Sequence, residues 1–369
     1  MQKRPCGKTG LDFTIIGFGA MRIHGGETRP WADLVAAAAD AGFNYFDTSH
    51  KYCSSTSEVK LGEGLKGRRD KVYISTKSSA DDFLTADAVR KVIDESLQKL
   101  QVDYLDFYQL WSLPLKDFNE IAIKPGGTLE GIRKAMSEGL IRHLGFTSHD
   151  TPENVIALLR TGEFESVTLQ YNIINRVNEP VIAEAARLGI GVVVMGPLHG
   201  GILGTRSDVF DRLVGGATGA AAEAAMRFVL SNPHVTCAIS GMTKMTDVDA
   251  NKRTAESFRP LSKKELAAVD EELRRFKAIT DALCTGCRYC MPCPQGVGIF
   301  VILTLANMAR VYGLVEGARR EYARFGREWP FADFKDATHC TECGQCLSKC
   351  TQKIDIPAEL AKAHELLKG

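Results

Sequence analysis

Cysteine is the residue type with the clearest chemical potential in this sequence. The chain has 369 residues and 11 cysteines, and eight of these cysteines lie in two short runs. The runs read Cys284-x2-Cys287-x2-Cys290-x2-Cys293-Pro294 and Cys340-x2-Cys343-x2-Cys346-x3-Cys350. Paired cysteines in a secreted mini-protein would suggest disulfides, whereas clustered thiols in a reducing compartment more often bind metal. We therefore interpret both runs as metal-binding segments.

The spacing within each run indicates iron–sulfur clusters. Three cysteines at intervals of three residues can wrap the chain around one corner of a 4Fe–4S cubane, and in two-cluster ferredoxins the fourth cysteine ligates the other cluster. By that rule the first cluster is bound by Cys284, Cys287, Cys290 and Cys350. The second cluster is bound by Cys340, Cys343, Cys346 and Cys293. Structural zinc also uses C-x2-C pairs and is the alternative, but it needs only four ligands.

A second set of candidate residues lies in the N-terminal part of the chain, at the ends of predicted strands. Asp47 and Tyr52 follow one apolar run, and Lys77 ends the next. A lysine on an apolar strand is costly unless a carboxylate pairs with it, and Asp47 is the obvious partner. A cationic lysine near a phenol lowers the phenol's pKa, which would make Tyr52 a general acid. The alternative is a structural Asp47–Lys77 ion pair with Tyr52 as a loop residue.

These side chains need a scaffold that gathers the C-terminal ends of its strands. Residues 14–255 alternate between short apolar runs, typical of strands buried on both faces, and longer helical patterns. The predicted strands are 14–21, 43–48, 72–77, 104–111, 143–148, 167–171, 191–195 and 236–241. Eight strand–helix units favour a (β/α)8 TIM barrel. A doubly wound sheet is disfavoured because no G-x-G-x-x-G follows the first strand.

Helix signals and the cysteine positions divide the chain into two domains. Thr85 and Thr151 are predicted N-caps, and Gly42 and Gly189 are predicted stops. Residues 261–283 read as one charged amphipathic helix that leads into the cysteine region. We therefore predict a barrel over residues 1–262, and a linking helix with a small α-helical ferredoxin-like domain over 263–369.

Several motifs resemble those of the aldo-keto reductase family, specifically the subgroup with a C-terminal iron–sulfur domain. The resemblance covers nearly the whole length and rests on the segments 17–22, 47–52, 57–62, 145–149, 169–172 and 195–201. It implies a barrel that binds NAD(P)H at its C-terminal mouth, with Tyr52 as proton donor and Lys77 and Asp47 as its tuners. It further implies that Thr147, Ser148 and Gln170 hold the nicotinamide carboxamide. The other cofactor-binding residues that it implies are Gly196, Leu198 and Asn251.

The chain departs from the family pattern at four positions. Trp111 stands where the family has its catalytic histidine, and Met195 where many members stack a tyrosine on the nicotinamide. Gly241 occupies the position of a lysine, and Asp247 that of the arginine that grips the 2′-phosphate. A carboxylate repels that phosphate but can accept a hydrogen bond from a ribose diol. The resemblance therefore favours NAD over NADP.

Two histidines could replace the missing acid–base residue. His149 lies just past the fifth predicted strand, although packing in a loop is its favoured interpretation, and His50 is close to Tyr52 and is a rival for the same role. His24 and His199 lie in glycine-rich segments, and we interpret both as solvated loop residues.

Composition limits the classes of partner. The 46 basic and 45 acidic residues give a net charge of +1, so nothing in the charge favours nucleic acid or a membrane surface. The N-terminus lacks a signal peptide and no apolar run could span a bilayer, so a cytoplasmic protein is expected.

The leading hypothesis is an iron–sulfur oxidoreductase that acts on a small carbonyl or alcohol in the barrel mouth. Nicotinamide moves two electrons as a hydride whereas each cluster moves one, so the two do not couple readily without a flavin. Either the clusters are structural, or a radical-capable substrate is reduced by single electrons. A ferredoxin-type donor or acceptor is a further candidate partner. The alternatives are an electron-transfer protein with a non-catalytic barrel, and a lyase or epimerase that uses Tyr52 and Lys77 without net redox change.

Overall fold

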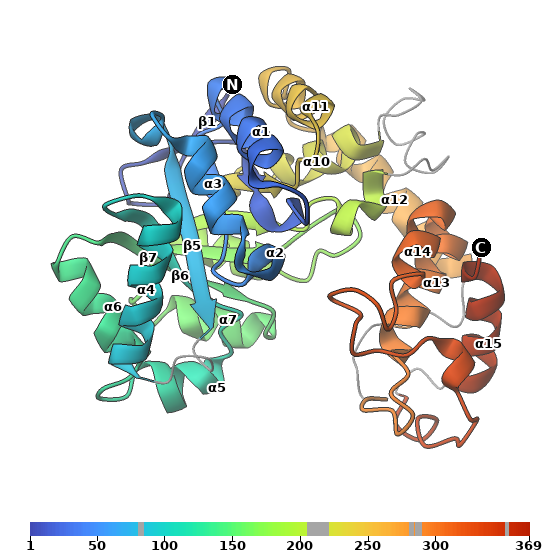
Figure 1. Ribbon diagram of the computed structural model, residues 1–369. Helices are drawn as coiled ribbons and strands as arrows, with labels where there is room; N and C mark the ends of the chain where they lie inside the picture. The colour runs from blue at the N-terminus through green and yellow to red at the C-terminus, as the bar shows by residue number, and fades with distance from the viewer. Residues whose placement is uncertain (80–84, 205–220, 280–283, 285–289, 351–353) are drawn as a thin grey trace. The chain divides into compact units, whose positions relative to one another are not determined.

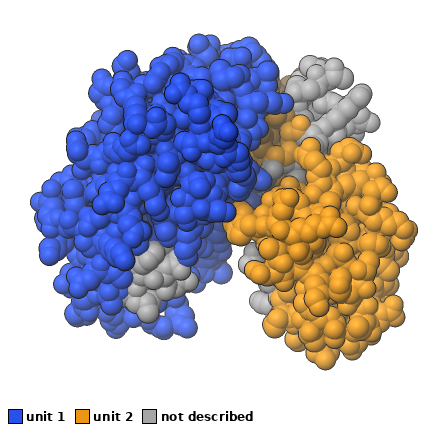
Figure 2. Space-filling model, in the orientation of Figure 1, with its two compact units in different colours: residues 1–197, 226–260 blue, residues 198–225, 261–369 orange. Residues whose placement is uncertain are grey.

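The computed structural model describes residues 1–79, 85–204, 221–279, 284, 290–350 and 354–369. The chain divides into two compact units, which Figure 2 distinguishes by colour. Unit 1 comprises residues 1–197 and 226–260, and unit 2 comprises residues 198–225 and 261–369. The predicted domain boundary at residue 262 is close to the start of the second segment of unit 2, but the sequence did not indicate that residues 198–225 group with the C-terminal residues. Part of the reason is that the 3-10 helix η4 (His199–Gly204) contacts helix α14 (Val315–Tyr322) within unit 2.

Unit 1 is built on a closed barrel of eight parallel strands, as predicted (Figure 1). The strands follow one another around the barrel in chain order, and β10 closes it between β9 and β3. Their bounds are β3 Ile16–Gly19, β4 Tyr45–Asp47, β5 Tyr73–Ser79, β6 Leu105–Trp111, β7 Ile141–Ser148, β8 Ser166–Gln170, β9 Gly191–Met195 and β10 Cys237–Ser240. Because all strands run in one direction, their C-terminal ends share one rim, where barrel enzymes place their active sites.

Helices connect these strands and cover the barrel. Those of unit 1 are α1 Thr28–Asp40, α2 Tyr52–Ser55, α3 Ser57–Leu65, α4 Ala86–Leu100, α5 Leu115–Asp117, α6 Thr128–Ser137, α7 Pro152–Leu159, α8 Glu179–Leu188 and α11 Met245–Glu256, with α10 Ala221–Ser231 crossing the unit boundary. The predicted N-caps are confirmed, because Thr85 accepts a hydrogen bond from the Ala88 amide at 3.2 Å and Thr151 one from Asn154 at 3.4 Å. Gly189 ends α8 in the left-handed region at φ 73°, as its type predicts.

The N-terminal end of the barrel is filled by aromatic residues. A short hairpin of β1 (Lys3–Pro5) and β2 (Asp12–Thr14) precedes the first barrel strand. It carries Phe13, whose ring stacks on Tyr45 at 4.4 Å between centroids and meets the edge of Phe107 at 5.4 Å. All three rings are fully buried, and Val193 belongs to the same cluster. This end of the barrel is therefore a packed core, and we expect an active site at the opposite rim.

In unit 2 the described residues form helices and no strand. The helices are α12 Lys263–Ile279, α13 Ile299–Tyr312, α14 and α15 Ile356–Leu367. Helix α13 packs against both α14 and α15, and it buries Ile302, Leu305 and Ala306. Over the described parts of both units, no helix combines the length and apolar character needed to cross a bilayer.

Candidate active site

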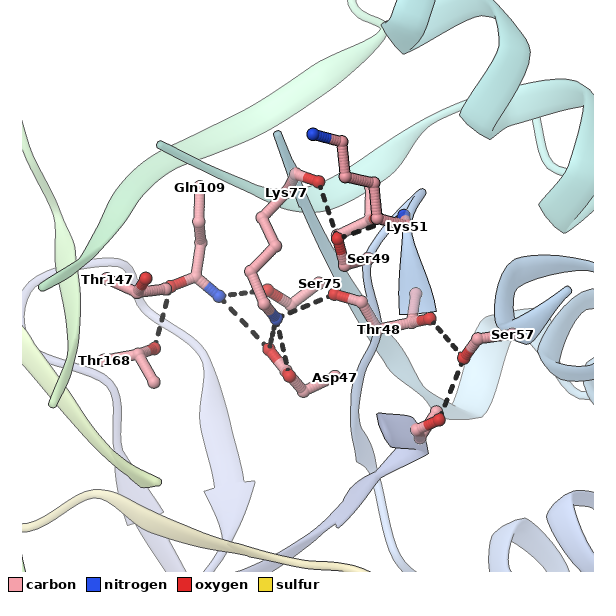
Figure 3. A network of polar contacts seen from close by, with 12 residues as sticks. Asp47, Thr48, Ser49, Lys51, Ser57, Ser75, Lys77, Gln109, Thr147 and Thr168 are labelled. Carbon is pink, nitrogen blue, oxygen red and sulfur yellow. Dashed lines mark hydrogen bonds and ion pairs between the residues drawn. The ribbon is translucent and has the colours of Figure 1, made fainter. Parts of the chain in front are cut away.

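A buried ion pair joins the ends of two neighbouring barrel strands. Asp47 is the last residue of β4 and Lys77 lies on β5. The Lys77 Nζ donates to the two carboxylate oxygens of Asp47 at 2.6 and 2.7 Å and to the Thr48 carbonyl at 2.7 Å (Figure 3). Both side chains are only 3% exposed. The ammonium thus has an acceptor for each of its three hydrogens, and the predicted pairing is present.

Burial and pairing act in opposite directions on this ion pair. Burial raises the pKa of Asp47 and lowers the pKa of Lys77, because it disfavours both charged forms. The attraction between the two groups opposes each shift. Removal of either partner would leave the other as an uncompensated buried charge.

A polar network continues from Asp47 across the barrel. The Gln109 amide nitrogen donates to the Ser75 hydroxyl at 2.6 Å and to Asp47 Oδ2 at 3.3 Å (Figure 3). The amide oxygen of Gln109 accepts a hydrogen bond from Thr168 at 2.8 Å. Sequence reasoning missed Thr168, although a threonine two residues before Gln170 on the same strand must point to the same side of the sheet. The hydrogen bond from Thr168 thus orients the Gln109 amide so that its nitrogen, and not its oxygen, points to the Asp47 carboxylate.

Tyr52 lies directly above the ion pair, but the direction of its pKa shift differs from the expected one. The Lys77 Nζ is 5.0 Å from the centre of the Tyr52 ring, a cation–π arrangement. Burial, with contributions from the charges of Asp47 and Cys53, raises the pKa of the Tyr52 phenol well above its usual value. The predicted lowering by Lys77 is therefore wrong, because desolvation of the phenol outweighs a cation already committed to Asp47.

The residue at the family's histidine position packs against this phenol. The Trp111 ring meets Tyr52 edge to face, with centroids 5.5 Å apart and planes at 86°. After Tyr52 the backbone turns through three consecutive left-handed residues, Cys53, Ser54 and Ser55, with φ of 56°, 55° and 64°. Left-handed geometry costs non-glycine residues about 1 kcal/mol or more each, and strain of this kind concentrates at functional sites.

Several residues implied to bind nicotinamide lie at the ends of β7, β8 and β9. The Thr147 hydroxyl accepts from the Ser112 amide at 2.7 Å, and the Ser148 hydroxyl donates to the Leu113 carbonyl at 2.8 Å. Both hydroxyls therefore also anchor the loop after β6. Gln170 ends β8 beside Gly196, where a Cβ would come within 3.7 Å of the Gln170 amide nitrogen. Gly196 has φ 64°, so the turn beside Gln170 is left-handed, a conformation that favours glycine.

Asp247, at the start of α11, has a structural role in capping this helix. Asp247 Oδ2 accepts hydrogen bonds from the Thr243 amide at 2.9 Å, the Thr243 hydroxyl at 3.1 Å and the Lys244 amide at 3.3 Å. The carboxylate thus caps the N-terminus of α11, which would otherwise attract an anion. The Asn251 side chain donates to the Asp247 carbonyl at 2.8 Å, which leaves its amide oxygen as an acceptor. The start of α11 therefore carries a carboxylate whose Oδ2 is already hydrogen-bonded within the chain.

The histidines differ from expectation at one position. The His50 Nδ1 bonds the Lys77 carbonyl at 3.0 Å, so that nitrogen must carry the proton. His24 is exposed, as expected for a solvated loop residue, and His149, a candidate for the acid–base role, is exposed as well. His199 is not a solvated residue: its Nδ1 is buried without a hydrogen-bond partner among the described residues, and burial lowers its pKa to about 4.

In unit 2, four of the eight clustered cysteines come together. The charges of Cys340, Cys343 and Cys293 all act on the Cys346 thiol, and together with burial they raise its pKa. A cavity of unit 2 is lined by these four residues and by Cys290. The Cys350 sulfur accepts a hydrogen bond from the Ile354 amide at 3.4 Å, and the Cys284 carbonyl accepts one from Asn307 at 3.2 Å. Cys287 lies outside the described residues.

The arrangement of the cysteines bears on the choice between a single metal ion, such as zinc, and a 4Fe–4S cluster. Among the residues that the structure describes, no three His, Cys, Asp or Glu side chains form a group that could hold a single metal ion. In a 4Fe–4S cluster each thiolate binds a different iron, so the ligand sulfurs lie farther apart than those around one ion. Cys293 lines one cavity together with Cys340, Cys343 and Cys346, and the assignment of ligands to two clusters stays a prediction.

Comparisons with known proteins agree with the fold. The family model described as "Aldo/keto reductase family" matches residues 15–274. An L-galactose dehydrogenase of Arabidopsis thaliana is 27% identical over 76% of this chain and 97% of the relative. An NADH-specific methylglyoxal reductase of Escherichia coli is 29% identical over 59% of this chain and 73% of the relative. Among solved structures, the holo form of aldo-keto reductase AKR11C1 from Bacillus halodurans superimposes with a TM-score of 0.64 at 25% identity, covering 73% of this chain and 96% of the other.

Proposed function

Since this chain belongs to the aldo/keto reductase family, and is therefore an oxidoreductase, we propose that it reduces a small carbonyl compound in the barrel mouth, with Tyr52 as proton donor and NADH as preferred cofactor. The observation that carries this proposal is the buried Asp47–Lys77 pair directly beneath the Tyr52 ring. A barrel without catalytic function would have no need to bury that pair. The same pair argues against a protein that only transfers electrons.

The raised pKa of Tyr52 keeps the phenol protonated at neutral pH. Tyr52 can therefore donate a hydrogen bond to a substrate carbonyl and pass on the proton as the alkoxide develops. The Lys77 ammonium lies 5.0 Å from the centre of the Tyr52 ring, and Asp47 holds this ammonium in place through two hydrogen bonds. Bound NADH would supply the hydride.

The choice of NADH is supported by the start of α11. Asp247 is the group that a 2′-phosphate would meet there, and its carboxylate already takes the hydrogen bonds of Thr243 and Lys244. Thr147, Ser148, Gln170, Gly196, Leu198 and Asn251 would contact the rest of the cofactor. The E. coli relative is named as NADH-specific, which agrees with this choice.

For unit 2 we propose two 4Fe–4S clusters in a ferredoxin-like domain. Cys284, Cys287, Cys290 and Cys350 would hold one cluster, and Cys340, Cys343, Cys346 and Cys293 the other. The proposal is supported by the closeness of Cys293, Cys340 and Cys343 to Cys346. Bound clusters would carry single electrons, which suits exchange with a ferredoxin-type partner in a reducing, cytoplasmic compartment.

The barrel proposal is tested by Tyr52→Phe. We expect kcat for carbonyl reduction to fall about 10²- to 10⁴-fold, the range for loss of a general acid. Tyr108→Phe is the matched control, because it removes another buried phenol on a barrel strand, bonded only to Ser78 at 2.5 Å. Full activity of Tyr52→Phe would remove Tyr52 from the mechanism.

The cluster proposal is tested by iron and sulfide analysis after anaerobic purification, with EPR after addition of NADH or dithionite. About eight irons per chain are expected from two cubanes. Stoichiometric zinc with negligible iron would contradict the proposal. Reduction by NADH would connect the two units electronically, whereas reduction by dithionite alone would favour an external electron donor.

A further inference from the structure

Lys60, in α3, is a buried lysine of unit 1 and is only 2% exposed. Its Nζ donates to the carbonyls of Ile23 and Gly25, both at 2.9 Å, and lies 5.7 Å from the centre of the Trp31 ring. Unlike Lys77, it pairs with no carboxylate in the part of the chain that the structure covers. A buried charge is costly unless other groups satisfy it, so the two carbonyls and the aromatic ring must hold this ammonium.

The two carbonyls belong to the loop that joins β3 to α1. This loop starts with the 3-10 helix η1 (Ala20–Arg22) and contains Gly25 and Gly26, which have φ of 60° and 66°. Glycines lose more conformational freedom on folding than other residues, so such a loop needs side-chain contacts to keep one conformation. Lys60 supplies two of these contacts, and the Trp31 Nε1 donates a third to the Gly25 carbonyl at 2.8 Å. The loop follows the C-terminal end of β3 and so lies at the rim where barrel enzymes act.

Two more side chains close to Lys60 in sequence bind the start of the same loop. The Cys53 thiol donates to the carbonyls of Ala20 at 3.6 Å and Met21 at 3.5 Å. The Ser57 hydroxyl donates to the Ala20 carbonyl at 3.0 Å. Since the Ser57 hydrogen is used there, the Thr48 hydroxyl must be the donor in its 2.8 Å contact with Ser57 (Figure 3). One short segment therefore grips the loop with three side chains, which we call the loop clamp: Cys53, Ser57 and Lys60.

The loop clamp begins directly after Tyr52. The three residues that follow Tyr52 are left-handed, and backbone strain of this kind persists only where the surrounding structure over-determines it. We propose that Lys60 is a positioning residue for carbonyl reduction, because its ammonium ties the loop after β3 to the segment that carries Tyr52 and so holds the phenol above Lys77. The inference rests on the proposed role of Tyr52 as proton donor.

Positioning and stability make different demands on this site. An apolar side chain of similar length would avoid the cost of burying an ammonium, and replacement of a buried charge by a well-packed apolar group is often neutral or stabilising. A methionine at position 60, however, cannot donate to the carbonyls of Ile23 and Gly25. Loss of the ammonium should therefore lower activity without lowering stability, which separates a positioning role from a purely structural one.

The test measures NADH-dependent reduction of a panel of small aldehydes and ketones by the full-length protein. We expect Lys60→Met to lower kcat about ten- to hundredfold, as for a displaced catalytic group, and to change KM for the carbonyl less than about threefold. Lys60→Arg keeps a cation that can donate to both carbonyls, so its kcat should stay within about fivefold of the wild type. Lys66→Met is the control, because Lys66 lies directly after the same helix and is exposed. It should leave kcat unchanged, and urea denaturation should find Lys60→Met at least as stable as the wild type.

Hydrogen exchange measured by mass spectrometry tests the loop clamp without any substrate. Peptides that cover residues 20–27 and 52–56 should exchange faster in Lys60→Met than in the wild type, while the barrel strands exchange equally in both. Equal kcat in Lys60→Met and an active wild type would overturn the role of Lys60 alone, as would a loss of kcat that is matched by a loss of stability. A wild type that reduces none of the carbonyls would overturn the proposed function and this role together, so the two failures are distinguishable.

Discussion

Replacement of Lys77 by methionine should make the stability of the barrel depend steeply on pH. The change removes the ammonium that donates to both oxygens of Asp47 and leaves that carboxylate buried, with Gln109 at 3.3 Å as a neutral donor. Burial already raises the pKa of Asp47, and Lys77 is the largest influence that opposes the rise. In the variant, Asp47 should therefore fold in its protonated form.

The cost follows from the proton that Asp47 must bind. In the unfolded chain the carboxyl titrates near its ordinary pKa of about 3.9. Between that value and the raised pKa, the folded state holds one proton more than the unfolded state, so stability falls as pH rises by about 1.4 kcal/mol per unit. That slope corresponds to a loss of at most about 3 kcal/mol between pH 5 and pH 7. A broken buried pair costs about 3–5 kcal/mol in total.

The assay is anaerobic urea denaturation of the full chain at pH 5, 6 and 7, with comparison of m-values to check that the same surface unfolds. Asp47→Asn with Lys77→Met should remove the pH dependence and recover much of the loss. Lys66→Met is the control, because its partner Glu63 and its own side chain are solvent-exposed enough for a change below about 1 kcal/mol. A Lys77→Met protein as stable at pH 7 as at pH 5 would refute the reasoning.

Three further predictions concern other parts of the chain. Asp247→Ala should remove the cap of α11 and lower the stability of the protein by about 1 kcal/mol. It should also narrow the difference between the Kd values for NADH and NADPH. An unchanged difference would show that Asp247 does not select the cofactor. Cys346→Ser should lower the iron content from about eight to about four per chain, whereas the buried Cys237→Ser should leave it unchanged, and equal iron content in both variants would exclude Cys346 as a ligand. Burial lowers the pKa of His199 to about 4, so the unfolded state binds a proton more readily than the folded state. The stability of the wild type should therefore fall as the pH drops from 6.5 towards 4. His199→Gln should reduce this pH dependence of stability in urea titrations, and identical pH dependence in both proteins would contradict the burial of His199.

The barrel and the central ion pair could be predicted from sequence because their signals are local. Eight apolar runs with helical patterns between them define the strands, and Thr85 and Thr151 mark helix starts through their own side chains. Asp47 and Lys77 were identified because a charged residue on an apolar strand needs a partner. Parallel topology then places both residues at one rim.

The errors came from properties that depend on tertiary packing. The pKa of Tyr52 rises because the folded chain desolvates the phenol, which its neighbours in sequence do not reveal. His199 is surrounded by glycines and looks solvated, yet η4 packs against α14, more than 100 residues later.

The aromatic core at the N-terminal end of the barrel also bears on where ligands enter and leave the barrel. Phe13, Tyr45 and Phe107 pack ring against ring at that end. Because these side chains fill the barrel there, we expect a substrate to enter and its product to leave at the opposite rim. Product release and entry of the next substrate would then use the same opening.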